Sequence, residues 1–137
     1  MTENVLKEKT KQMAIEVGRL TEKLPSNRLN NTYINQIIRC SFSVGANYRA
    51  ACRAKSTNDF VNKLRIVEEE ADETLYFLEL LAEFNADYKA EMRKIYLDAE
   101  MILKIIVASI ITSVKKKDYR PLNRYARSRT PKSKIKS

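Results

Sequence analysis

The chain contains almost none of the residues that tight turns require, because only two glycines and three prolines occur among its 137 residues. A β-rich fold of this length needs many turns, so this scarcity argues against one. Long segments in which apolar residues recur every three or four positions predict helices instead. The sequence therefore predicts an all-α protein whose length suits one domain with a single core.

Three short interruptions divide this helical pattern into four segments. Leu24-Pro25-Ser26-Asn27 ends the first, since proline excludes helical geometry from the residue before it. The helices are expected at about 3–23, 30–54, 57–84 and 88–116. Because the connections are short, we predict an antiparallel up-down-up-down four-helix bundle over residues 1–116, followed by a basic, irregular C-terminal tail over residues 117–137.

Helix-starting residues stand at the expected boundaries. Asn30 or Asn31 suits the start of the second helix. Ser56 is expected to cap the third, with Asp59 reaching back as in a short-chain capping box. In the first helix the apolar stripe predicted to face the core is Leu6, Met13, Val17, Leu20 and Leu24.

The residue types that catalysis and metal binding favour are scarce. The chain has no histidine, which removes the commonest general base and the commonest metal ligand. Cys40 and Cys52 fall in one predicted helix, roughly 18 Å apart, so we expect no disulfide between them. We therefore expect no enzymatic activity, no cofactor and no metal site. Reduced thiols and the lack of a secretory signal favour a cytoplasmic protein.

Positive charge is concentrated at the C-terminal end of the sequence. Residues 115–137 hold ten Lys or Arg and one acid, so they carry the whole net charge of +9. Cations bind phosphates with release of counterions, and tyrosine rings stack on unpaired bases. The candidate nucleic-acid-binding residues are Arg49, Arg53, Lys55, Lys115, Lys116, Lys117, Tyr119, Arg120, Arg124, Tyr125, Arg127 and Arg129. The alternative is that the tail is a solubilising extension that binds polyanions only incidentally. The longest apolar run of the chain is too short to span a membrane.

The second predicted helix has a small, polar stripe beside its apolar one. Gln36, Ser43 and Asn47 lie on this stripe and are expected to form a buried, hydrogen-bonded network inside the bundle.

Charge and apolar surface on the second and third helices favour self-association. No acid occurs between Glu22 and Asp59, whereas the third helix is rich in acids and has two apolar stripes. A helix in a monomeric bundle needs only one apolar stripe. The second apolar stripe of the third helix is therefore expected to be covered by another copy of the chain, with the copies arranged head to tail in a ring. The candidate oligomer interface comprises Arg39, Phe42, Arg49, Ile66, Glu69, Glu73 and Phe77. The alternative is a wider internal core with solvated charges, or pairing of these charges within one subunit.

Several motifs resemble one known family. Gln36-Ile37-Ile38-Arg39, Ser43-Val44, Asn47-Tyr48, Lys55-Ser56 and Asp59-Phe60 occur in the order seen in the large-subunit rRNA intervening-sequence protein family of bacteria, and the resemblance covers roughly residues 5–116. It implies an antiparallel four-helix bundle that assembles as a homopentamer. Relatives that serve diversity-generating retroelements work with nucleic acid and a reverse transcriptase.

The chain departs from the family at one corner of the second helix. Members usually carry a glutamate and a glycine where this sequence reads Arg49-Ala50-Ala51. No role tied to that glutamate is carried over, and the corner becomes more basic. The leading hypothesis is a non-enzymatic oligomer that binds RNA or DNA nonspecifically. The alternative is an interaction module whose ring docks an acidic protein partner.

Overall fold

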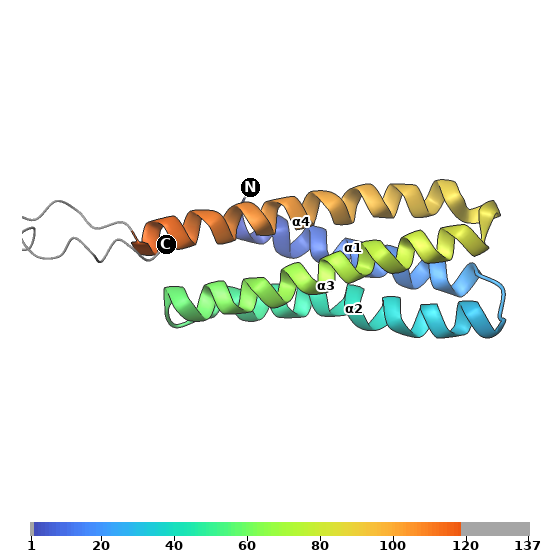
Figure 1. Ribbon diagram of the computed structural model, residues 1–137, viewed down its shortest axis with the longest axis horizontal. Coiled ribbons are helices and arrows are strands. Elements are labelled where there is room, and N and C mark those ends of the chain that lie inside the picture. The colour runs from blue at the N-terminus through green and yellow to red at the C-terminus, as the bar shows by residue number, and fades with distance from the viewer. Residues whose placement is uncertain (1, 119–137) are drawn as a thin grey trace, which may run out of the picture.

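Each of the four predicted segments folds as one helix in the computed structural model, which describes residues 2–118 (Figure 1). The helices are α1 (Glu3–Lys23), α2 (Arg28–Cys52), α3 (Thr57–Phe84) and α4 (Lys89–Asp118), and a short 3-10 helix, η1 (Ala86–Tyr88), precedes α4. Successive helices run antiparallel and side by side, which confirms the predicted four-helix bundle. Helix α4 continues to Asp118 rather than ending near Lys116, and the rest of the predicted tail lies outside the described residues.

Side-chain caps begin the first three helices. The Thr2 hydroxyl accepts a hydrogen bond from the Val5 N–H, and the Ser56 hydroxyl accepts one from the Asp59 N–H at 3.1 Å, as predicted for Ser56. The cap of α2 is Asn27, whose side-chain amide oxygen accepts a hydrogen bond from the backbone N–H of Asn30 at 2.8 Å. The predicted start of α2 is therefore about a turn late, because Asn27 satisfies the first free N–H groups directly after the Pro25 break.

The Asp59 carboxylate completes the start of α3. It accepts a hydrogen bond from the backbone N–H of Lys55 at 3.4 Å and pairs with Lys63 at 2.8 Å. The hydrogen bond from Lys63 lowers the pKa of the Asp59 carboxyl below its ordinary value. Asp59 therefore reaches back as predicted, although to the residue before the cap.

Replacing Ser56 with alanine should destabilise the fold by about 1 kcal/mol, because α3 loses its side-chain cap. Urea unfolding followed by circular dichroism measures this change. Asn58→Ala is the matched control, since Asn58 is an exposed neighbour in the first turn of α3. Equal destabilisation by the two substitutions would contradict the capping role.

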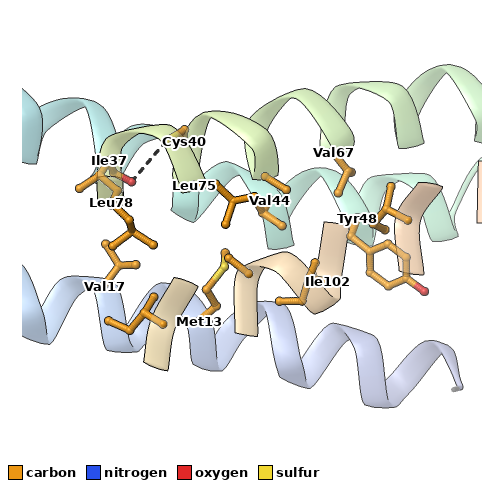
Figure 2. Close-up of a cluster of buried hydrophobic side chains, with 14 of the residues drawn as sticks. Met13, Val17, Ile37, Cys40, Val44, Tyr48, Val67, Leu75, Leu78 and Ile102 are labelled. Atoms are coloured by element: carbon orange, nitrogen blue, oxygen red, sulfur yellow. Dashed lines mark hydrogen bonds between the residues drawn. The ribbon is translucent and has the colours of Figure 1, made fainter. Parts of the chain in front are cut away.

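The core runs along the axis of the bundle and receives side chains from all four helices. Figure 2 shows Met13 and Val17 of α1 packing toward Val44 of α2, Leu78 of α3 and Ile102 of α4. The predicted stripe of α1 is confirmed, because Leu6, Met13, Val17, Leu20 and Leu24 are all buried. Each buried aliphatic side chain of this size contributes about 1.5–3 kcal/mol, so the core dominates the stability of the fold.

Two asparagines join the two turns at one end of the bundle. Asn30, in the first turn of α2, and Asn85, after α3, are buried and exchange two side-chain amide hydrogen bonds of 2.8 Å each. The Asn30 amide also donates to the Pro25 carbonyl, and the Asn85 amide donates to the Leu81 carbonyl. All the polar atoms of this buried pair are therefore engaged with protein groups, and the pair fixes how the two turns meet.

Within residues 2–118, no helix is long and apolar enough to cross a membrane.

Candidate nucleic-acid interface

Three helix termini meet at the end of the bundle opposite the two asparagines. The N-terminus of α3 and the C-termini of α2 and α4 lie there, and α1 begins on the same side but further along the bundle, as Figure 1 shows. The candidate residues Arg49, Arg53, Lys55, Lys115 and Lys116 are all exposed at this end. The fold therefore brings together cations that are up to 67 positions apart in the sequence, and the chain continues from α4 into residues 119–137 at the same end.

The remaining candidate residues continue the sequence beyond Lys116. The side chain of Lys117 is not described, and Tyr119, Arg120, Arg124, Tyr125, Arg127 and Arg129 lie outside the described residues. Their predicted role in nucleic-acid binding stays a prediction.

Two of the acids at this end of the bundle are paired locally. Glu3 lies 3.1 Å from the Lys7 ammonium one turn along α1, and Asp59 is bound to Lys63 and to the Lys55 N–H. Glu8 accepts a hydrogen bond from the Gln12 amide at 3.1 Å, and because this amide is neutral the Glu8 charge is not compensated. The two ion pairs of Glu3 and Asp59 leave the charge of more distant cations uncompensated.

Two residues that sequence reasoning did not select extend the basic end along α1. Lys7 and Lys11 lie one helical turn apart on α1 and, with Arg49 of α2, line a shallow groove between the two helices. Their spacing at i and i+4 was the only available signal, and it is too common in helices to indicate a site. The groove is a product of helix packing.

Arg39 and Glu73 bind each other within one chain. The Arg39 guanidinium donates to Glu70 at 3.1 Å and also pairs with Glu73, and these interactions join α2 to α3. The hydrogen bond with Glu73 is the main cause that raises the pKa of Arg39. These charges of the candidate oligomer interface are thus matched inside the subunit, the alternative that the sequence left open.

The other candidate interface residues lie on two separate sides of the subunit. Phe42 and Arg49 border the groove between α1 and α2, whereas Ile66 and Glu69 are exposed on α3 and Phe77 is half-buried there. The second apolar stripe of α3 is not enclosed, because Ile66 is 43% exposed and Phe84 is 51% exposed. Helix α4 carries three further exposed apolar side chains, Leu97, Met101 and Ile111.

The predicted buried network of Gln36, Ser43 and Asn47 is wrong. Gln36 is exposed, and the Ser43 hydroxyl and Asn47 amide are half-buried groups that donate to carbonyls one turn back in α2. The small, polar stripe lies at the edge of the α2–α3 contact, and only Cys40 from this stripe enters the core. Burial of polar side chains occurs instead at Asn30 and Asn85, and at the Thr10 and Thr21 hydroxyls, which donate to carbonyls of their own helix.

The two cysteines are free, and neither lines the basic groove. Burial raises the pKa of the Cys40 thiol, which accepts a hydrogen bond from the Thr74 hydroxyl at 3.4 Å. Burial is also the main cause that raises the pKa of Cys52. Among the described residues, no three Cys, Asp or Glu side chains gather in a way that would hold a metal ion.

Comparisons with known proteins agree with this fold. A family model described as 23S rRNA-intervening sequence protein matches residues 2–108. A solved structure of a protein of unknown function from the S23 ribosomal protein family of Bacteroides thetaiotaomicron VPI-5482 is 35% identical, with a TM-score of 0.73. That match covers 80% of this chain and 98% of the other chain. No curated protein matches the chain.

Proposed function

The chain belongs to the 23S rRNA-intervening sequence protein family, and we propose that it works without catalysis, as a helical oligomer that binds RNA or DNA without sequence preference. The observation that carries the proposal is the groove between α1 and α2 lined by Lys7, Lys11 and Arg49, with exposed Arg53 just after the C-terminus of α2. Residues 119–137 add seven more Lys or Arg. A nucleic-acid phosphate backbone is the common ligand of such a dense array of cations, and this electrostatic binding does not depend on base sequence.

The oligomer is supported by apolar side chains that one subunit leaves in water. They lie along α3 and along α4, on two different faces, so a face of one copy meets a different face of the next. Contacts of this kind close into a ring when the rotation between neighbours allows it. A ring holds several basic ends at once, so weak binding by each end is converted into avidity.

Light scattering of the full chain should give a mass near five times that of one subunit, the assembly that the family resemblance implies. Replacing Ile66 with glutamate should shift the mass toward one subunit, because a charge would enter the proposed interface. Asn35→Glu is the control, since it adds the same charge at an exposed position of α2, outside the apolar rows of α3 and α4. A monomeric parent protein would overturn the assembly.

Binding of the parent protein to RNA should weaken steeply as salt rises. Each phosphate neutralised on a single strand contributes a slope of about 0.7 to the fall of log affinity with log salt concentration. With several cations engaged, we expect a slope of about 5 or more, measured by fluorescence anisotropy with a labelled RNA. The affinities for RNA and DNA of different sequences should agree within about tenfold. No measurable binding near 50 mM salt, a concentration at which roughly all such contacts hold, would overturn the nucleic-acid function.

A further inference from the structure

The groove between α1 and α2 exists because small residues face each other across the helix contact. Gly45 packs so closely against α1 that a Cβ placed there would lie 3.1 Å from the Thr10 hydroxyl oxygen. Ala14 and Ala46 continue this floor, and the hollow above it holds about 260 Å³. A shallow strip of backbone and methyl groups is thus open to solvent.

The rim of the groove is basic. Lys7 and Lys11 rise from α1, Arg49 rises from α2, and no acid lines the hollow. Lys11 and Arg49 are exposed and have no ion-pair partner among residues 2–118. Because Lys7 is paired with Glu3 at 3.1 Å, the uncompensated charge of the rim comes from Lys11 and Arg49, and an anionic occupant gains from both of them at once.

An exposed aromatic ring borders the same groove. The Phe42 side chain remains 47% exposed, although it lies against α1, where a Cβ on Gly18 would be 3.7 Å from the ring. Because Gly18 offers the ring only backbone, one chain covers little of it. A base has the flat apolar surface that covers such a ring, and base–aromatic stacking contributes about 1–3 kcal/mol per base.

We propose that the α1–α2 groove is a binding site for single-stranded nucleic acid, in which Lys7, Lys11 and Arg49 hold consecutive phosphates and one base stacks on Phe42. The inference rests on the proposed function and adds the strand type and the site. Single strands fit because their bases are free to turn toward the ring, whereas bases of a duplex already stack on one another.

Tryptophan fluorescence tests the stacking directly, because the chain contains no tryptophan. Phe42→Trp places a single reporter in the groove, and Phe84→Trp places one at an equally exposed position at the other end of the bundle. An oligouridylate of about 12 nucleotides, long enough for one site, should quench the fluorescence of Trp at position 42 and leave the other unchanged. Equal quenching at both positions, or quenching by an RNA duplex or by polyglutamate to the same extent, would overturn the assignment.

A charge-matched pair of double variants tests the cations. Lys11→Gln with Arg49→Gln should lower the affinity for the oligouridylate on the order of tenfold, because two phosphate contacts are lost. Arg65→Gln with Lys104→Gln removes the same charge from exposed positions of α3 and α4 and should have a much smaller effect. If the parent binds and both pairs lose affinity equally, the groove is rejected while the proposed function stands. If the parent does not bind at all, both are rejected.

Discussion

Removing residues 119–137 should lower the affinity of the protein for single-stranded RNA on the order of 10³-fold at a low salt concentration of about 50 mM. The deleted segment carries seven Lys or Arg and no acid. If each contacts one phosphate, the slope of log affinity against log salt should become shallower by about 5. Anisotropy titrations of both proteins at several salt concentrations measure the two effects together.

Two controls separate charge from the aromatic residues of this segment. Replacing its seven cations with glutamine should reproduce the loss caused by the deletion, since counterion release depends on charge. Replacing Tyr119 and Tyr125 with alanine should keep the salt slope and lower the affinity only through lost stacking. Residual binding by the shortened protein should then depend on Lys11 and Arg49. An unchanged affinity after the deletion would contradict the role of the segment and leave binding to the bundle alone.

Replacing either Asn30 or Asn85 with alanine should destabilise the bundle by about 2–4 kcal/mol. Removal of one side chain leaves the buried amide of its partner without two hydrogen bonds and opens a small cavity. Asn85→Ala also frees the Leu81 carbonyl, and Asn30→Ala frees the Pro25 carbonyl. Chemical denaturation followed by circular dichroism gives both free energies of unfolding.

The double variant makes this test specific. Once one amide is gone, removal of the other leaves no further buried partner unpaired. The double variant should therefore lose about 1–2 kcal/mol less stability than the two single variants added together. Asn35→Ala, at an exposed position of α2, should change stability by less than about 0.5 kcal/mol. Additive effects of Asn30→Ala and Asn85→Ala would show that the pair does not act as a unit.

The helices and most of their boundaries followed from the sequence, because local interactions decide them. Pro25 ends α1 and Ser56 caps α3 through interactions between residues close in the sequence. The apolar stripe of Leu6, Met13 and Val17 predicts which side of α1 is buried. The start of α2 is predicted about a turn late because Asn27 and Asn30 are both good cap residues, and local sequence does not show that the Asn30 side chain is used to bind Asn85.

Only the tertiary structure decided which helix faces meet and what they bring together. A period of 3.6 residues fixes the spacing of a stripe but not its neighbour, so the polar stripe of Gln36, Ser43 and Asn47 was placed inside when it lies at an edge. Asn30 and Asn85 are 55 positions apart and meet because the packing of α2 on α3 sets their register. The groove that joins Lys11 to Arg49 likewise arises from two helices in contact, and no separation along the chain encodes such a contact.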